Sequence, residues 1–425
     1  MIQSSPDLTT TDAALARVPA LGWYRAPRLD RRAASVLINE FTRQNAPKSA
    51  IVVGVDADSP VLTEAINAML PGDTITVVAD CAAVGSADPA ALRRRIELEG
   101  SWVSRRVSVV ATLADAKPAD AVVVGRPLTT EEAPPVIALL HEAVVPGGAM
   151  CLATVAVPGS DAPELPGEVA TDLVLLNRPP VRVHRLRRSP VDAVTAERID
   201  PAFRPSSVPL TGQWRIDSNG VAAAAFCLGA AWLAKRARPG SRWWLVPALA
   251  ALPVAAFFRD PERVPPEDPR AIVSSADGKV LAVERLTDDR FSSVEVSDWL
   301  RISVFLSIFD VHVNRSPVAG RVVEVIRENG GYAPAMQPEA EHNVAAYTVL
   351  ETRHGPAVVA QRTGLVARRI VHRARPGALL ARGERFGLIR FGSRTDVYLP
   401  IDAAEPLVAP GERVRGGESV IARWR

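Results

Sequence analysis

The residues best placed to do chemistry are Gly392 and Ser393, which lie between two strand-like runs near the C-terminus. Apolar residues at 386–391 and 397–399 predict a strand on either side, so the pair should lie at a tight bend. Glycine adopts backbone conformations that other residues resist, and such a bend can bring the Ser393 hydroxyl against the Gly392 carbonyl. A nucleophile beside a carbonyl is what a chain needs to cleave its own backbone.

Four blocks of the C-terminal half resemble the motifs of the phosphatidylserine decarboxylases. The run 384–400 resembles the family's self-cleavage segment, in which a Gly-Ser bond breaks and the serine becomes an N-terminal pyruvoyl group. The family's entry, Asp-Gly and histidine motifs resemble, in order, Phe257-Phe-Arg-Asp-Pro-Glu-Arg263, Ser275-Ala-Asp-Gly-Lys279 and Leu306-Ser-Ile-Phe-Asp-Val-His-Val-Asn-Arg-Ser-Pro317. The match is most similar to the short bacterial and archaeal form.

This resemblance implies a specific course of self-cleavage. Attack by Ser393 on the Gly392 carbonyl converts the amide into an ester, and removal of the Ser393 α-proton eliminates that ester to leave a dehydroalanine. Hydrolysis then releases ammonia and leaves the pyruvoyl group, with chains 1–392 and 393–425 as products. His312 is the predicted base, because imidazole titrates near neutral pH and can accept and return a proton.

The partners of His312 are less directly indicated. Asp277 matches the Asp-Gly motif, so the resemblance makes it the carboxylate that orients the base. Asp310, two residues before His312 on the same face of an extended segment, could hold the ring instead or fix the loop. Longer family members carry a second histidine where this chain has Arg315. Either His312 serves both self-processing and decarboxylation, or Arg315 takes a binding role.

The resemblance also implies a decarboxylase whose cofactor is the pyruvoyl group made from Ser393. Its ketone takes up the electron pair released with CO2, as pyridoxal phosphate does in other enzymes. Residues 353–394 hold ten arginines and one acidic residue, Glu384, which suits an anionic partner such as phosphatidylserine or an acidic membrane, or else forms a solvated surface. The candidates for contacts with the lipid phosphodiester are Arg315, Arg368, Arg369 and Arg394.

Composition predicts a globular chain with two domains. The 425 residues are 48% hydrophobic with a net charge of +3, which gives no signal for nucleic-acid binding. Cys81, Cys151 and Cys227 lie far apart without paired or Cys/His spacing, so we expect neither a disulfide framework nor a metal site. The N-terminus lacks the basic start and apolar core of a signal peptide, and we expect a reducing, cytoplasmic setting.

Alternating strands and helices over residues 1–190 predict a doubly wound, Rossmann-like α/β domain. The strands are predicted at 50–55, 74–78, 107–112, 121–125 and 149–156, with helices at 60–69, 89–98 and 134–143. Asp56 and Asp80 follow the first two strands, where such folds bind a ribose.

Val145-Pro-Gly-Gly148, before the fifth strand, resembles a feature of class I methyltransferases that use S-adenosylmethionine. However, Gly54 is followed by no further glycine, so the backbone could not approach a ligand closely. We expect a methyltransferase-like fold without that activity and do not expect S-adenosylmethionine to bind, while Asp56 and Asp80 remain candidates for another ligand.

Residues 191–215 are predicted to be a linker rich in proline, serine and charge, and residues 216–260 to associate with a membrane. The second segment holds two uncharged stretches, 220–234 and 243–258, each shorter than the roughly 20 residues that span a bilayer. We interpret them as a hairpin or a pair of helices lying in one leaflet, with tryptophans at the polar boundary, on the cytoplasmic face of the cell membrane. A buried pair of core helices and a two-helix span are the alternatives.

Residues 261–425 predict an α+β domain made mainly of short strands, the decarboxylase-like part. The leading hypothesis is a membrane-associated enzyme that makes phosphatidylethanolamine from phosphatidylserine. The alternatives are a pyruvoyl-dependent decarboxylase of a soluble amino acid, a bifunctional decarboxylase and lipid methyltransferase, and a decarboxylase whose N-terminal domain is a regulatory module. The two chains of one precursor would stay together, and a homo-oligomer is left open.

Overall fold

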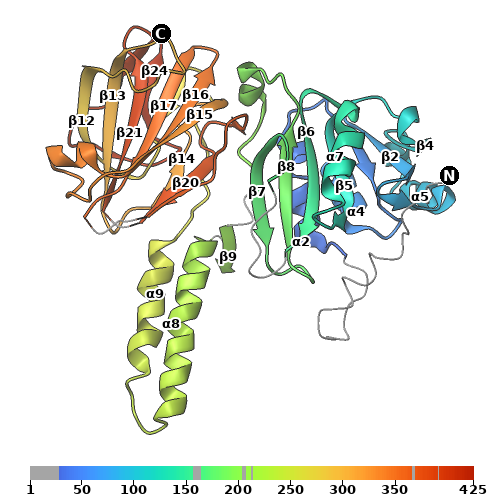
Figure 1. Ribbon diagram of the computed structural model, residues 1–425, viewed down its shortest axis with the longest axis horizontal. Helices are drawn as coiled ribbons and strands as arrows, with labels where there is room; N and C mark the ends of the chain where they lie inside the picture. The colour runs from blue at the N-terminus through green and yellow to red at the C-terminus, as the bar shows by residue number, and fades with distance from the viewer. Residues whose placement is uncertain (1–27, 157–163, 203–206, 212–213, 366–368, 391) are drawn as a thin grey trace, which may run out of the picture.

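The computed structural model describes residues 28–156, 164–202, 207–211, 214–365, 369–390 and 392–425 (Figure 1). These residues form an α/β domain, a domain built from strands, and a helical hairpin that projects from the body. The predicted fold classes of both domains are confirmed.

The N-terminal domain is built on an eight-stranded sheet in the order β3-β2-β1-β5-β6-β8-β7, with β4 paired to β2. Its strands are β1 (Ser49–Val53), β2 (Thr74–Cys81), β3 (Gly85–Ser86), β4 (Val107–Thr112), β5 (Ala119–Leu128), β6 (Val144–Val155), β7 (Glu168–Val174) and β8 (Val181–Arg187). β1, β2, β4, β5 and β6 run parallel, and β8 lies antiparallel between β6 and β7.

Helices cover both faces of this sheet. They are α2 (Arg31–Leu37), α3 (Asn39–Thr42), α4 (Pro60–Asn67), α5 (Pro89–Leu98), α6 (Ser101–Ser104) and α7 (Ala133–Leu140). Because strand side chains alternate between faces, Val52 of β1 packs in one core with α2, α4 and α5, and Val53 packs in the other with α7. This is the doubly wound arrangement that the sequence predicts.

The C-terminal domain is an eight-stranded sheet, β19-β15-β16-β17-β21-β13-β12-β23, with two three-stranded sheets, β14-β20-β18 and β11-β24-β22. The strands are β11 (Ala271–Val273), β12 (Gly278–Thr287), β13 (Asp298–Leu306), β14 (Val313–Arg315), β15 (Gly320–Glu328), β16 (Ala345–Thr352), β17 (Gly355–Arg362), β18 (Ile370–His372), β19 (Leu379–Leu380), β20 (Arg385–Ile389), β21 (Ser393–Pro400), β22 (Ala404–Pro406), β23 (Arg413–Val414) and β24 (Val420–Trp424). The described helical residues after 261 are one 3-10 turn, Pro338–His342.

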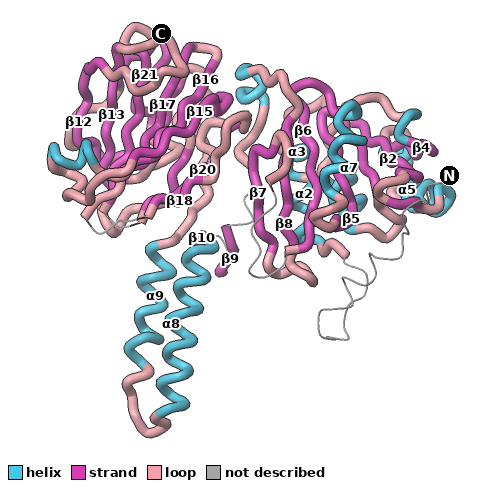
Figure 2. The backbone as a smooth tube through the Cα atoms, viewed as in Figure 1, coloured by secondary structure: helices cyan, strands magenta, loops and turns pink. Residues whose placement is uncertain are grey.

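Helices α8 (Ser218–Ala237) and α9 (Leu245–Phe257) pack against each other and project from the body below β14 and β20 (Figures 1 and 2). At their base, a Cβ atom on Gly220 would lie 2.3 Å from the Cβ atom of Phe258, so glycine is needed for the two helices to approach. Phe226 is 80% exposed, which excludes the buried core pair considered above. No helix in the described part of the chain is long and apolar enough to cross a membrane.

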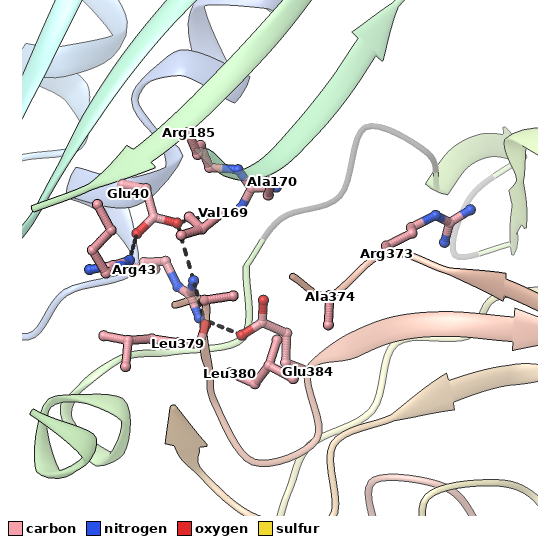
Figure 3. A pocket seen from close by; sticks show the side chains of 12 residues that line it. Glu40, Arg43, Val169, Ala170, Arg185, Arg373, Ala374, Leu379, Leu380 and Glu384 are labelled. Carbon is pink, nitrogen blue, oxygen red and sulfur yellow. Dashed lines mark hydrogen bonds and ion pairs between the residues drawn. The ribbon is translucent and has the colours of Figure 1, made fainter. Parts of the chain in front are cut away.

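The two domains meet at buried charged residues, here called the interdomain cluster (Figure 3). Its members are Glu40, Arg43, Asp172, Arg185, Arg187 and Glu384, all buried. Arg43 donates to Glu384 across the interface and lies 3.2 Å from Glu40, which also accepts from Arg187 at 2.6 Å. Burial alone would raise the pKa of Glu40, but the arginines lower it far below its ordinary value. Glu384 directly precedes β20, so the N-terminal domain is anchored to the segment that leads to Gly392.

Candidate active site

Ser393 is the first residue of β21 and is fully buried. It pairs with Leu306 of β13, and its Oγ has no hydrogen-bond partner among the described residues. Gly392 has a φ of 60°, and its carbonyl oxygen lies so close to Gly364 that a Cβ atom there would come within 1.7 Å. Gly364 therefore makes room for the carbonyl group that the Ser393 hydroxyl would attack.

The bend at Gly392 joins two different sheets rather than two strands of one hairpin. β20 pairs with β14 and β18, whereas β21 pairs with β13 and β17. Residue 391 lies outside the described residues. The connection is short because β20 ends at Ile389 and β21 begins at Ser393, so each end of it is held by a separate ladder of hydrogen bonds.

His312 lies beside this connection with its ring buried. Its Nδ1 is 2.9 Å from the carbonyl oxygen of Asp310. A carbonyl oxygen only accepts, so Nδ1 carries the hydrogen and Nε2 presents its lone pair. In the described structure Nε2 has no partner, and the ring of Phe257 lies 4.1 Å away, centroid to centroid. Burial lowers the pKa of His312 to about 4, so the ring is neutral at pH 7 and suited to act as a base.

The backbone brings His312 and Ser393 onto neighbouring segments. Ile389, the last residue of β20, donates its N–H to the carbonyl oxygen of His312 at 3.2 Å. Val313 pairs with Leu388 in the same ladder. β20, which is hydrogen-bonded to the backbone of His312, is therefore the strand that leads into Gly392 and Ser393.

Asp310 makes the contacts for both roles considered from the sequence, which are holding the His312 ring and fixing the loop. Its backbone carbonyl holds the His312 ring, and its carboxylate accepts from the N–H and the hydroxyl of Ser307 at 2.8 and 2.6 Å. The residue thus fixes the turn between β13 and β14 and sets the tautomer of the base at the same time.

Asp277 has other partners. Its carboxylate is 3.0 Å from Arg263 and accepts from the backbone N–H of Gly416 at 2.7 Å. Burial raises its pKa, and Arg263 opposes that rise. The orienting contact that was predicted for Asp277 is made here by the Asp310 carbonyl, because Asp277 is committed to joining the entry motif to Gly416. A catalytic part for Asp277 stays a prediction.

Two of the four arginines predicted to bind the lipid are already engaged. Arg315 is buried and donates to the carbonyl oxygens of Gly383 and Pro261 at 3.0 and 2.7 Å. Arg394 bonds Asp396 at 2.6 Å and Glu341 at 3.1 Å. Both are held by contacts within the domain, and a lipid-binding role for them stays a prediction. Arg369 is exposed, and Arg368 lies outside the described residues.

Sequence reasoning missed a group of buried polar residues on the face of the sheet that carries Ser393. Gln361 pairs with Thr395, two residues after Ser393, and its Nε2 donates to Oδ1 of Asn314 at 2.7 Å. Asn314 Nδ2, Gln361 Oε1 and Thr395 Oγ1 have no partner in the described part of the chain. Unpaired buried polar atoms are costly and gather at functional sites. The signal was present, because Gln361 directly follows the apolar run 356–360 within a predicted strand.

The loop after β1 in the N-terminal domain is closed by the chain itself. A Cβ atom on Gly54 would lie 2.3 Å from Cγ1 of Val84, and Arg126 donates to the carbonyl oxygen of Val84. Asp56 and Asp80 are exposed beside this covered loop. A ligand could reach the backbone of Gly54 only by displacing Val84, which argues against a cofactor there. Binding by Asp56 and Asp80 stays an untested prediction.

Comparison with known proteins identifies the C-terminal domain. A sequence model described as phosphatidylserine decarboxylase matches residues 251–422. A phosphatidylserine decarboxylase proenzyme of Carboxydothermus hydrogenoformans is 44% identical over 171 residues, which cover 40% of this chain and 79% of the relative. Another from Mycobacterium bovis is 46% identical over 179 residues, covering 42% and 77%. The protein is thus an enzyme of the carboxy-lyase class. It belongs to the phosphatidylserine decarboxylase family.

The solved structures that match part of the chain include methyltransferases. An O-methyltransferase of Streptomyces achromogenes is 11% identical with a TM-score of 0.29, covering 44% of this chain and 92% of its own. An O-methyltransferase of Bacillus cereus is 12% identical with a TM-score of 0.28, covering 42% and 88%. Similarity at this level carries no activity over to the chain.

Proposed function

We propose that the protein is a self-processing, pyruvoyl-dependent phosphatidylserine decarboxylase that forms phosphatidylethanolamine and CO2. The backbone breaks between Gly392 and Ser393, giving chains 1–392 and 393–425. The observation that carries this proposal is a pair of buried atoms without partners in the described structure, Oγ of Ser393 and Nε2 of His312. The relatives are named as proenzymes, which agrees with a precursor that is cut.

The first step needs a neutral base and a positioned nucleophile. Nε2 of His312 accepts the hydroxyl proton of Ser393 while Oγ adds to the carbonyl carbon of Gly392. The C–N bond then breaks, the amine of residue 393 takes the proton back, and an ester joins the two residues. Loss of the Ser393 α-proton expels the Gly392 carboxylate. Water completes the reaction by releasing ammonia.

The surroundings of Ser393 fit the pyruvoyl group that these steps would produce. When formed, the pyruvoyl group supplies a ketone that takes up the electron pair released with CO2. Residue 393 stays at the start of β21, which β13 and β17 hold on both sides. Asn314, Gln361 and Thr395 offer neutral hydrogen-bonding groups next to it. His312 can return a proton to the product side of the reaction.

The helical hairpin supports a lipid substrate over a soluble amino acid. Its described surface exposes large apolar side chains, among them Phe226, Trp232, Leu249 and Leu252. At its tip, Lys235 lies 5.0 Å from the ring centre of Trp244, and Arg236 lies 5.7 Å from that of Trp232. Tryptophan and basic side chains together suit the headgroup layer of an anionic membrane. These contacts support membrane association, and the cytoplasmic face of the cell membrane is the proposed location.

Intact mass spectrometry tests the proposal. We expect the wild-type protein to give a chain that starts at residue 393 and carries a pyruvoyl group, together with release of CO2 from phosphatidylserine. Ser393→Ala should remain one uncut chain of 45.4 kDa. Ser303→Ala is the matched control, because Ser303 is a buried serine on β13 that pairs with Asp396 on the other face of the sheet. A wild-type protein that is never cut at Gly392 would refute the proposal.

A further inference from the structure

The turn between β13 and β14 presents two large apolar side chains to solvent. Ile308 is 54% exposed and Phe309 is 79% exposed. The turn is held firmly, because the carboxylate of Asp310 accepts twice from Ser307 and the N–H of Phe309 lies 3.3 Å from the Ser307 hydroxyl. The backbone thus holds two large apolar side chains exposed to water. Such exposure is unfavourable and marks an interaction surface.

This turn lies directly beside both the base and the root of the hairpin. Asp310, its last residue, holds the His312 ring. Arg259, just after α9, donates to the carbonyl oxygen of Phe309. Phe257, at the end of α9, packs on His312. The exposed side chains of the turn therefore continue the exposed apolar surface of the hairpin up to the active site.

A third exposed apolar residue lies next to the contact between Gly364 and Gly392. Leu365 is exposed and follows Gly364, whose Cα packs against the carbonyl group of Gly392. Exposed Arg413 lies 3.5 Å from the Asp310 carboxylate, so a cation stands next to the apolar turn. Apolar side chains with a basic residue beside them match the boundary between lipid tails and phosphate groups.

We propose that the turn Ser307–Asp310 inserts into the phospholipid bilayer and seats the active site on it. The occupant of this surface is the bilayer rather than another protein, because the turn continues a projecting hairpin whose described surface is apolar on both helices. Ile308 and Phe309 enter the acyl region, and Arg413 meets the phosphate layer. A lipid then reaches buried Ser393 without leaving the membrane. This inference rests on the proposed lipid substrate.

The test uses the double variant Ile308→Ser with Phe309→Ser in the full chain. We expect normal cleavage at Gly392 and unchanged decarboxylation of a short-chain phosphatidylserine dissolved as monomers. Decarboxylation in vesicles of phosphatidylserine and phosphatidylcholine should fall about tenfold, which corresponds to about 1.4 kcal/mol. Leu407→Ser is the matched control, since Leu407 is an exposed apolar residue beside β24, and it should change neither rate.

Binding to vesicles is measured separately from decarboxylation. A failure of this inference can then be told apart from a failure of the proposed function. Uncut Ser393→Ala protein is sedimented with the same vesicles, with and without the two turn substitutions, and we expect about tenfold weaker binding when the turn is changed. Equal binding with and without the substitutions would overturn the inference. An equal loss of activity on dissolved and vesicle-bound lipid would also overturn it, because the turn would then act on His312 alone. Should the wild-type protein lack decarboxylase activity, the binding experiment still decides.

Discussion

Loss of the Phe257 ring should shift the pH dependence of self-cleavage. The ring lies 4.1 Å from His312, and both side chains are buried. Burial is the largest cause of the low His312 pKa, which hydrogen bonding and charge from Asp310 oppose and Arg259 reinforces. Phe257→Ala opens one face of the imidazole to water, which favours its charged form and raises the pKa.

The size of the effect follows from the pKa difference. The ordinary value is 6.5 and the buried value is about 4, and this gap corresponds to about 3 kcal/mol at 1.36 kcal/mol for each pKa unit. Other buried groups still cover the ring, so we expect the pKa of His312 in the variant to regain about half of this difference and to lie at about 5. Since a base acts only when neutral, wild-type cleavage should stay fast down to about pH 4, and cleavage by the variant should slow from about pH 5 downwards.

The assay follows the imidazole signal of His312 by nuclear magnetic resonance in uncut Ser393→Ala protein, with Phe257 present or replaced. The rate of cleavage against pH is then measured in chains that retain Ser393. Phe257→Leu is the control, because leucine keeps an apolar cover over the ring and avoids most of the 3–5 kcal/mol that a Phe→Ala cavity costs. An unchanged His312 pKa in folded Phe257→Ala protein would show that this ring is not what keeps water from the base.

Two further predictions concern the segment that leads to the cleavage site. Arg43→Ala should lower the free energy of unfolding by about 3–5 kcal/mol in urea titrations, because it removes the guanidinium group that forms an ion pair with buried Glu384. Adding Glu384→Gln should recover part of that loss, and additive losses would contradict the pairing. Gly387→Ala should slow or abolish cleavage on gels, since its Cβ atom would lie 2.5 Å from the Val371 carbonyl oxygen. Gly229→Ala, where a Cβ atom meets nothing within 4 Å, should cleave normally.

Sequence patterns predict the five parallel strands of the N-terminal domain and three of its helices, but not the antiparallel strands β7 and β8. The strand at Val107–Thr112 and the helix at Pro89–Leu98 begin and end where expected. Both are bounded by strong local signals, since Asp88 caps the helix and Pro89 occupies its first turn. β6 starts at Val144, before the predicted 149, because pairing with β5 extends it through Pro146, Gly147 and Gly148, which have little strand propensity of their own.

The active site is less predictable because it depends on backbone direction. Nothing in the residue type of Asp310 shows that its carbonyl, rather than the Asp277 carboxylate, would face His312. Arg394 follows Ser393 on the same strand, so the two side chains point to opposite faces of the sheet, and the role predicted for Arg394 in binding the lipid stays a prediction. The contact of Arg43 with Glu384 joins residues 341 positions apart, and local patterns carry no information about it.

The proposed cut divides the domain between strands that belong to different sheets. β20 and the whole interdomain cluster would remain on the large chain, so that cluster stays an intramolecular contact after cleavage. β21 to β24 would belong to the small chain. That chain would stay bound to the large chain through pairing with β13, β17, β12 and β11. The mature enzyme would therefore consist of two chains that share two sheets, β11-β24-β22 and the eight-stranded sheet. The small chain could not dissociate without breaking the pairing of β21, the strand that begins at residue 393.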